Sequence, residues 1–278
     1  MDRFLRKKMF DLFKQQPWLA HREEKLNKLI DMCDDISDID MIFDLLSRFK
    51  YVGIESLSIH LRDIVDHINE EFGEEAFSFQ LCAATADGDA DSGQSILYAF
   101  KSEPISEILL EDFILTNSLS RAIKIMDQRK NIILLDEFAG TGETIVSRIK
   151  SIRGREKELK NKNNHNFSCK VSVCLVAAMD SAVELIKKYA DDVYSSIVLK
   201  KGITDEVDFN KRDVSIFRML SLEESFVKDK KFYRLGYGQT EALYFREKGN
   251  IPNNVFPVFW SKNKIDDKNW KPLFYRKE

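Results

Sequence analysis

The chain has 278 residues, of which 44% are hydrophobic and 32% are charged, a balance typical of a soluble globular protein with one large or two small domains. The formal net charge of -3 argues against a protein that is basic over its whole surface, so direct nucleic-acid binding is not indicated. The sequence shows no secretory hydrophobic segment and no apolar run long enough to span a membrane. We therefore expect a cytoplasmic protein without membrane contacts.

Four cysteines, Cys33, Cys82, Cys169 and Cys174, show no metal-binding spacing, and the chain has only four histidines, so a zinc site is not expected. Three of the cysteines lie in apolar, strand-like runs, where reduced core thiols are more common than ligands or disulfides. Residues five apart in a strand point to opposite faces. Cys169 and Cys174 are therefore predicted to be reduced and unlinked.

Residues 1–72 are predicted to form a helical N-terminal region. The apolar positions between Ile54 and Phe72 follow a helical period, and a similar stripe begins at Ile39. The first eight residues include four lysines or arginines. This basic start fits a solvated helix face or a contact with a partner or nucleic acid.

Residues 73–278 are predicted to form an α/β domain. Apolar, strand-like runs at 77–84, 131–135, 170–177 and 194–199 alternate with helix-like segments at 117–129, 142–160 and 180–190. This alternation favours a mostly parallel sheet flanked by helices. Beyond about residue 205, glycines and prolines interrupt the pattern, which predicts an irregular C-terminal cap with edge strands at 241–245 and 255–260.

The segment from Ile132 to Thr144 is the most specific feature of the sequence. Four apolar residues lead into Asp136 and Glu137, and a glycine-containing turn precedes a predicted helix. Parallel sheets bind ligands at the carboxyl ends of their strands, and a helix N-terminus offers amide N–H groups and a positive dipole end to a phosphate. The candidate phosphate-binding residues are Ala139, Gly140, Thr141, Gly142, Glu143 and Thr144. A plain strand–turn–helix junction with an N-cap threonine is the alternative.

This segment resembles the signature of the type I phosphoribosyltransferases, in which four apolar residues, two acids and three variable residues precede Thr-Gly-x-Thr. The resemblance implies that residues 139–144 hold the 5′-phosphate of phosphoribosyl pyrophosphate. It also implies that Asp136 and Glu137 are catalytic residues that contact the ribose hydroxyls and hold Mg²⁺ indirectly through the ligand. The order Asp-Glu departs from the usual Asp-Asp or Glu-Asp, which favours a shifted ribose contact or a site that binds without efficient turnover.

In the same family, the strand before the signature ends in a loop that grips pyrophosphate. The corresponding residues here are Asp87, Gly88, Ser92 and Gly93, and Lys101 stands where a basic residue often follows. Aspartates in this loop can attract Mg²⁺, although a solvated acidic loop needs no function. Lys101 also fits an ordinary surface lysine.

Two patterns fit a degenerate P-loop ATPase instead. Residues 132–137 look like a Walker B strand, and residues 88–95 match the Walker A pattern except that Gln94 replaces the lysine. The replacement removes the cation that neutralises the β- and γ-phosphates. Three aspartates between residues 87 and 91 would also repel a triphosphate unless a metal intervened.

Two segments of the tail, 235–245 and 251–260, resemble the closing motifs of a divergent bacterial branch of the superfamily. Members of that branch occur in anti-phage defence operons beside ATPases or retron reverse transcriptases, which implies an operon-encoded partner protein. The turn at 252–254 can aim the amide of Asn253 into a base pocket. Trp260 can stack on a base, or it can belong to the core.

These features predict a phosphoribosyltransferase-like protein that binds phosphoribosyl pyrophosphate or a nucleotide with Mg²⁺, as an effector enzyme of a bacterial anti-phage defence system. The alternative is a non-catalytic module that senses such a ligand and controls a partner protein. The degenerate P-loop ATPase is the third hypothesis.

Overall fold

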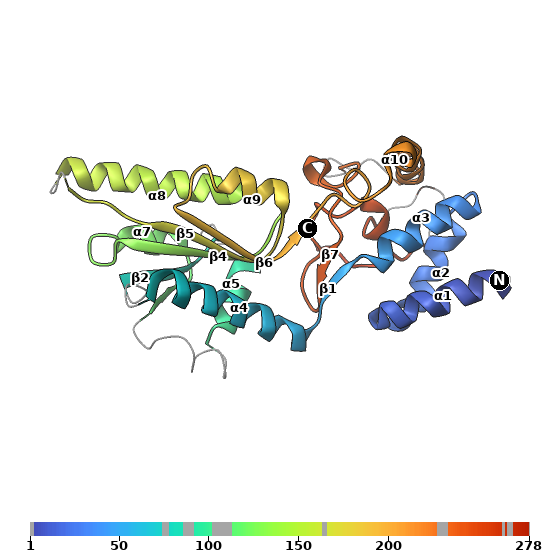
Figure 1. Ribbon diagram of the computed structural model, residues 1–278, viewed down its shortest axis with the longest axis horizontal. Helices are drawn as coiled ribbons and strands as arrows, with labels where there is room; N and C mark the ends of the chain where they lie inside the picture. Colours follow the sequence, from blue (N-terminus) through green and yellow to red (C-terminus); the bar gives the residue numbers. More distant parts are fainter. Residues whose placement is uncertain are drawn as a thin grey trace. The chain divides into compact units, whose positions relative to one another are not determined.

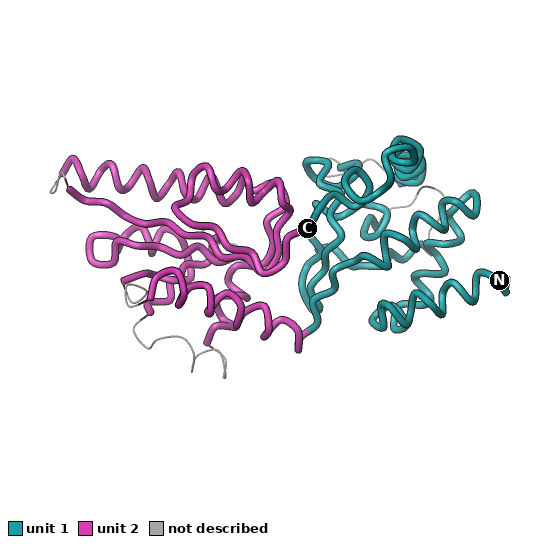
Figure 2. The backbone as a smooth tube through the Cα atoms, in the orientation of Figure 1, with its two compact units in different colours: residues 1–53, 200–278 teal, residues 54–199 magenta. Residues whose placement is uncertain are grey.

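The computed structural model describes residues 3–73, 78–85, 92–101, 113–162, 166–226, 233–262, 265 and 269–277. The chain divides into two compact units (Figure 2). Unit 1 comprises Met1–Gly53 and Lys200–Glu278, and unit 2 comprises Ile54–Leu199. Unit 2 is thus an uninterrupted stretch of chain, whereas unit 1 is built from both ends of the sequence. None of the described helices is long and apolar enough to cross a lipid bilayer.

Unit 2 contains a five-stranded sheet with the strand order β3-β2-β4-β5-β6, in which all neighbours pair in parallel. The strands are β2 (Phe79–Ala83), β3 (Ile114–Thr116), β4 (Asn131–Ala139), β5 (Val171–Met179) and β6 (Asp192–Leu199). Every residue of β2 and β5 is buried, as expected for parallel strands covered on both faces. The predicted α/β fold with a mostly parallel sheet is confirmed.

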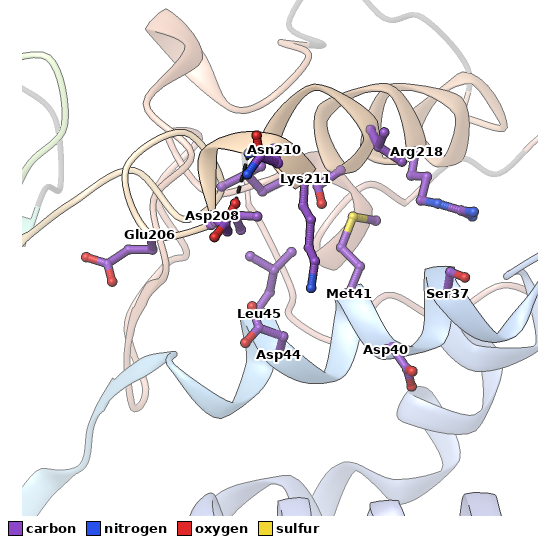
Figure 3. Close-up of a pocket in the computed structure, with 14 residues that line it drawn as sticks. Ser37, Asp40, Met41, Asp44, Leu45, Glu206, Asp208, Asn210, Lys211 and Arg218 are labelled. Carbon is purple, nitrogen blue, oxygen red and sulfur yellow. Dashed lines mark hydrogen bonds between the residues drawn. The ribbon is translucent and has the colours of Figure 1, made fainter.

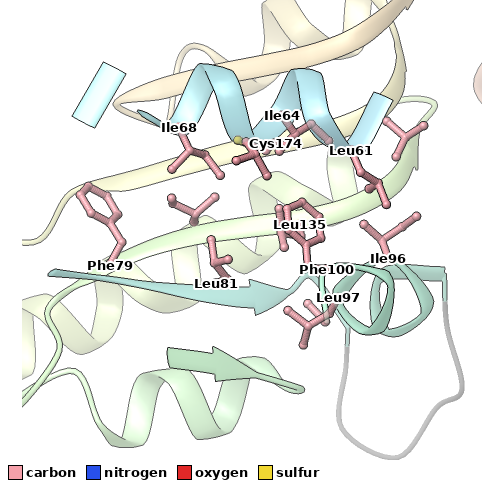
Figure 4. Close-up of a cluster of buried hydrophobic side chains, with 14 residues drawn as sticks. Leu61, Ile64, Ile68, Phe79, Leu81, Ile96, Leu97, Phe100, Leu135 and Cys174 are labelled. Carbon is pink, nitrogen blue, oxygen red and sulfur yellow. The ribbon is translucent and has the colours of Figure 1, made fainter. Parts of the chain in front are cut away.

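Helices cover both faces of this sheet (Figure 1). They are α4 (Ile54–Phe72), α5 (Ser92–Ala99), α7 (Leu119–Lys124), α8 (Glu143–Lys162) and α9 (Asp180–Ile186). Helices α4 and α5 contribute to a buried apolar cluster, in which Leu61 and Ile64 of α4 and Ile96 of α5 pack with Leu135 of β4 (Figure 4). Helices α8 and α9 lie on the opposite side of the sheet from α4.

Helix α4 belongs to the sheet unit and not to a separate N-terminal region. The predicted boundary lies between residues 72 and 73, whereas the boundary between the two units lies between Gly53 and Ile54. The reason is burial: Leu61 and Ile68 are 2% and 0% exposed, and α4 contacts β5 and β6. An apolar stripe shows that a helix face is buried, but it does not show which part of the chain buries it.

Unit 1 brings the two ends of the chain together. Its elements are α1 (Arg3–Gln15), η1 (Pro17–Arg22), α2 (Glu23–Asp31), α3 (Ile36–Ser47), β1 (Lys50–Val52), α10 (Phe209–Glu224), η3 (Tyr237–Gln239), β7 (Tyr244–Arg246) and η4 (Pro257–Phe259). Strands β1 and β7 pair in parallel, with Lys50 opposite Tyr244. Trp18 lies between Tyr51 and Phe274, at centroid distances of 4.8 and 5.5 Å. Aromatic stacking therefore joins η1 to the tail.

The C-terminal cap differs from its prediction in one segment. Strand β7 overlaps the expected edge strand at 241–245, and it pairs with β1. The described residues 255–260 form no strand: Val255 makes an isolated bridge with Ala242, and η4 begins at Pro257. Proline fixes its own φ and lacks the N–H that a strand would use, which explains why the extended pattern stops there.

All four cysteines are free, as predicted. Cys82, Cys169 and Cys174 are buried. Desolvation by burial raises the pKa of the Cys169 thiol to about 11 and also raises the pKa of Cys174. A thiol with a raised pKa holds very little reactive thiolate near neutral pH. We therefore assign these cysteines to packing rather than to catalysis.

Glu223 is a fully buried carboxyl group of unit 1, with 0% of its surface exposed. Its Oε2 accepts the N–H of Leu235 at 2.9 Å, while Oε1 has no hydrogen-bond partner among the described residues. Desolvation raises the pKa of Glu223 to about 8, and the charge of Glu241 adds to the shift. The Leu235 amide and Arg234 oppose the shift without cancelling it.

We expect Glu223→Gln to make the stability of unit 1 less dependent on pH. In the folded chain the carboxyl group keeps its proton up to about pH 8, whereas in the unfolded chain it ionises near pH ~4.3. Between these values the folded state binds more protons, so rising pH lowers the wild-type stability, by up to about 1.4 kcal/mol per pH unit from this group. Urea unfolding at several pH values between 5 and 8.5 measures the two slopes.

The control is Glu224→Gln at the neighbouring position, where the side chain is 62% exposed and the slope should change little. Equal slopes for wild type and Glu223→Gln would mean that Glu223 is already ionised in the folded chain.

Candidate active site

Strand β4 carries both predicted catalytic acids. The predicted strand ends at Leu135, but β4 continues to Ala139 because β5 pairs with it as far as Ala178. Asp136 and Glu137 therefore lie within the strand and not after it, with exposed fractions of 8% and 2%. Neighbouring side chains of a strand point to opposite faces, so the two carboxylates are predicted to leave the sheet in different directions.

The turn between β4 and α8 has the predicted strand–turn–helix arrangement, with Glu143 as the first residue of the helix. Gly142 has a φ of +79°, and a Cβ atom there would lie 3.1 Å from the carbonyl oxygen of Ala182 in α9. Both the backbone conformation and this close packing require glycine. The hydroxyl of Thr141 accepts the N–H of Glu143 at 3.4 Å, and Thr144 is exposed in the first helical turn.

The two predicted ligand loops meet at Asp136. Ser92, the first residue of α5, donates its hydroxyl to Oδ1 of Asp136 at 2.8 Å, and the N–H of Glu137 donates to the same oxygen at 2.7 Å. Gly93 packs so closely that a Cβ atom there would lie 3.1 Å from the carbonyl oxygen of Leu135. The start of α5 and the carboxyl end of β4 are thus in direct contact.

Thr85 lies at the same edge, although the sequence analysis did not select it. It lies two residues after the last residue of β2 and is 0% exposed. Its hydroxyl has no hydrogen-bond partner among the described residues, and a Cβ atom on Gly93 would lie 3.1 Å from it. A buried hydroxyl without a partner costs free energy. The signal for this residue was its position, as the first polar side chain after an apolar strand.

For the remaining members of the predicted pyrophosphate loop, the described part of the structure shows no contact with Asp136. Asp87 and Gly88 lie outside those residues. Lys101 is exposed just beyond the C-terminal end of α5. A helix of eight residues rises about 12 Å along its axis. The backbone of Lys101 is therefore remote from Ser92 at the other end of the helix.

Asn253 and Trp260, the predicted base pocket, both belong to unit 1. The Trp260 ring is 8% exposed, and its indole N–H donates to the carbonyl oxygen of Val255 at 2.8 Å. The carbonyl oxygen of Asn253 accepts the N–H of Tyr237 at 2.8 Å. These bonds tie the tail segments 235–245 and 251–260 together and give Trp260 the core position that the sequence left open.

Within the described part of the chain, no group of three or more His, Cys, Asp or Glu side chains could hold a metal ion by itself. Asp136 and Glu137 supply carboxylate oxygens, the ligand type that Mg²⁺ prefers. Mg²⁺ is commonly held by one or two carboxylates together with phosphate oxygens of a ligand. The residues at the end of β4 therefore fit a Mg²⁺ that arrives with a phosphorylated compound.

A separate cavity of about 590 Å³ lies in unit 1, between α3 and the N-terminal part of α10 (Figure 3). Met41 and Lys211 line it from the two helices, together with Arg218. Arg218 is held by ion pairs of 2.9 and 2.8 Å to Asp35 and Asp38. The cavity shares no residue with the site at the end of β4.

We expect Gly142→Ala to destabilise unit 2 and Gly154→Ala to stabilise it slightly. Alanine at 142 would keep a φ of +79° and press its Cβ against Ala182, at a cost of about 1–3 kcal/mol. At Gly154, inside α8, a Cβ atom meets nothing within 4 Å, so alanine should add about 0.5–1 kcal/mol. Chemical denaturation measures both changes. A Gly142→Ala variant as stable as the wild type would contradict the need for glycine at this turn.

Three solved structures resemble part of this chain. Xanthine-guanine-hypoxanthine phosphoribosyltransferase of Helicobacter pylori is 12% identical, with a TM-score of 0.33, over 52% of this chain and 85% of that chain. Orotate phosphoribosyltransferase of Aeropyrum pernix is 16% identical, with a TM-score of 0.32, over 54% and 74%. A hypothetical protein of Neisseria gonorrhoeae with bound ppGpp is 10% identical, with a TM-score of 0.32, over 60% and 95%.

The chain also matches a family model, whereas no curated protein matches it. The model is that of the PRTase-CE family, and it matches residues 32–276. The match includes the whole of unit 2 and the tail as far as residue 276, and it leaves out α1, η1 and α2. With its parallel sheet, its glycine turn at the end of β4 and a match over most of its length, the chain belongs to the phosphoribosyltransferase-like PRTase-CE family.

Proposed function

We propose that this protein binds phosphoribosyl pyrophosphate or a related nucleotide at the carboxyl edge of its sheet and acts on it as a phosphoribosyltransferase-like enzyme. The observation that carries the proposal is the 2.8 Å hydrogen bond from Ser92 to Asp136. It brings the start of α5 to the carboxyl end of β4, the strand that leads into the predicted phosphate loop at residues 139–144. Membership of the PRTase-CE family supports the same class of ligand.

In this proposal the ligand is held by backbone amides and hydroxyl groups more than by cations. The N-terminus of α8, a helix of 20 residues, offers its amides to the 5′-phosphate. Thr141 and Thr144 add hydroxyl donors without adding charge. Asp136 accepts hydrogen bonds from the ribose hydroxyls, and Ser92 keeps the Asp136 carboxylate in position.

Mg²⁺ is the proposed cofactor, and Asp136 and Glu137 would hold it through the ligand. When bound, the ion neutralises pyrophosphate charge and so helps this group to leave. The proposed reaction is a displacement at C1 of the ribose, where positive charge develops on the sugar. Amides at the start of α8 keep the phosphate end of the sugar fixed during this step, which limits the motion of the reacting carbon. We assign no general base.

A second function, sensing without turnover, is favoured by a specific observation. Oδ1 of Asp136 already accepts two hydrogen bonds, and Glu137 is 2% exposed. A ribose hydroxyl that approaches Oδ1 would therefore compete with Ser92, whereas one that approaches Oδ2 would not. Such a site can bind a nucleotide and control a partner protein without reaching a reactive geometry.

We also propose that the protein is an effector of a bacterial anti-phage defence system, with an operon-encoded partner such as an ATPase or a reverse transcriptase component. Family membership and the resemblance of segments 235–245 and 251–260 to the defence branch support this role. Plaque assays on cells that carry the complete operon test it. Equal protection by wild-type and site variants would count against an effector role of this site.

The degenerate P-loop ATPase is the third candidate. Gln94 lies in α5, at the place where that reading requires a lysine. ATP hydrolysis by the purified protein that is lost on changing Ser95 would favour it over the two phosphoribosyl functions.

We expect Asp136→Ala with Glu137→Ala to abolish ligand binding while the sheet stays folded. A structural acid at a turn is worth about 0.5–2 kcal/mol, a fraction of a domain stability of about 5–15 kcal/mol. Loss of the ribose contacts instead leaves ligand hydroxyls unpaired, at about 1–3 kcal/mol each. Calorimetry with phosphoribosyl pyrophosphate and Mg²⁺, together with thermal melting, measures both effects.

The matched control is Asp136→Asn, which keeps a group that accepts the hydrogen bond from Ser92 but removes the charge. Normal binding by the double alanine variant, with a normal melt, would contradict a role for these acids. Release of pyrophosphate by the wild type separates the enzyme from the sensor, since a sensor binds the ligand and releases none.

A further inference from the structure

The outer side of β6 is an unpaired edge of the sheet. This strand is last in the strand order and pairs with β5 on its inner side. Among the residues that the structure describes, no backbone hydrogen bond joins the outer side of β6 to another segment. Proteins usually protect such an edge with short length, proline or lysine. β6 has eight residues, and Asp192 is its single charged side chain.

Helix α4 runs beside this strand. His60 Nδ1 lies 2.8 Å from the hydroxyl of Ser196, and His67 Nε2 lies 3.0 Å from the carboxylate of Asp192. The His67 ring also stacks on Tyr194, with 4.3 Å between ring centroids. These side-chain contacts fix α4 beside β6.

An acidic stripe follows the same side of α4. It consists of Asp63, Asp66 and Glu70, and Arg62 is the single lysine or arginine of the helix. Burial raises the pKa of Tyr194, and the charges of all three stripe residues add to that shift. The hydroxyl of Ser196 in β6 donates to Oδ2 of Asp63 at 2.6 Å, so the stripe starts directly beside this strand.

We propose that the edge of β6 accepts an extended, basic segment of a partner protein as an additional strand. Backbone hydrogen bonds of an edge strand provide affinity for any extended chain, and neighbouring side chains provide the selectivity. Here the acidic stripe selects lysine and arginine. Val198, which is 56% exposed, offers an apolar contact near the other end of the strand.

A second copy of this chain fits the edge less well. If two β6 strands paired in an antiparallel manner about a two-fold axis, the two sheets would join edge to edge into one sheet. Equivalent faces of the two copies would then lie on the same side of this joined sheet. The two acidic stripes of α4 would then lie on one face of the joined sheet, where like charges repel. The charge of the edge thus favours a basic partner. The inference does not depend on the function proposed for the end of β4.

A fluorescent ten-residue peptide of alternating lysine and valine is the probe, at low salt with the full chain. Two peptides serve as controls: one with proline in place of every valine, which keeps the charge but cannot pair as a strand, and one with glutamate in place of every lysine. We expect both controls to bind at least about tenfold more weakly than the probe, because each lacks one of the two required interactions.

The variant is Asp66→Lys with Glu70→Lys, two exposed positions, and we expect it to bind the probe about tenfold more weakly because attraction becomes repulsion. Its control is Asp11→Lys with Asp213→Lys, which makes the same change in net charge at exposed positions of unit 1 and should leave binding unchanged. Hydrogen exchange should slow at residues 192–199 when the probe binds.

Equal binding of the proline peptide, or unchanged exchange at residues 192–199, would overturn strand addition. Equal binding by both charge variants would overturn selection by the acidic stripe. A stable dimer in solution whose residues 192–199 are already protected without peptide would mean that a second copy occupies the edge.

Discussion

A strand that is paired on both sides and covered on both faces has almost no freedom of position, and β4 is such a strand. It lies between β2 and β5, and Ile132 to Leu135 are 0% exposed. Because all five strands run in parallel, the loops after β2 and β4 emerge at the same edge of the sheet. The hydrogen bond from Ser92 to Asp136 spans 44 positions of sequence, and it follows from this single constraint.

Local patterns predicted the strand–turn–helix geometry at the end of β4 correctly because its causes are local. The turn at Gly142 requires a positive φ. Two glycines and two threonines that follow an apolar strand predict this turn from the sequence. The extension of β4 to Ala139 was not predictable in this way, since it depends on pairing with β5. The place of α4 in unit 2 likewise depends on which sheet its apolar stripe meets. Thr85 was overlooked because its burial depends on the packing of Gly93 from α5.

The tail segments that resemble closing motifs prove to hold unit 1 together. A Cβ atom on Gly236 would lie 1.9 Å from the carbonyl oxygen of Asn254, so the two segments touch through backbone at this point. The buried carboxylate of Glu241 accepts the N–H groups of Ile203 and Thr204, each at 2.8 Å. Within these segments, only Asn253 and Trp260 were predicted to line a base pocket. The hydrogen bonds of Glu241 stabilise a cap that has little regular secondary structure.

The division of the chain also sets an order in which the protein can form during synthesis. Lys50 can pair with Tyr244 only after the whole of unit 2 has been synthesised. The stacking of Trp18 on Phe274 can form only later, because Phe274 lies still nearer the C-terminus. Unit 2, in contrast, is continuous, so its sheet can close as soon as β6 leaves the ribosome. The first helices meanwhile expose apolar faces that have no cover, the condition in which nascent chains aggregate or need a chaperone. A ribosome that stalls once β6 has left the exit tunnel, but before Tyr244 has been added, would therefore carry a closed sheet with its glycine turn, preceded by an N-terminal segment that still lacks its C-terminal partners.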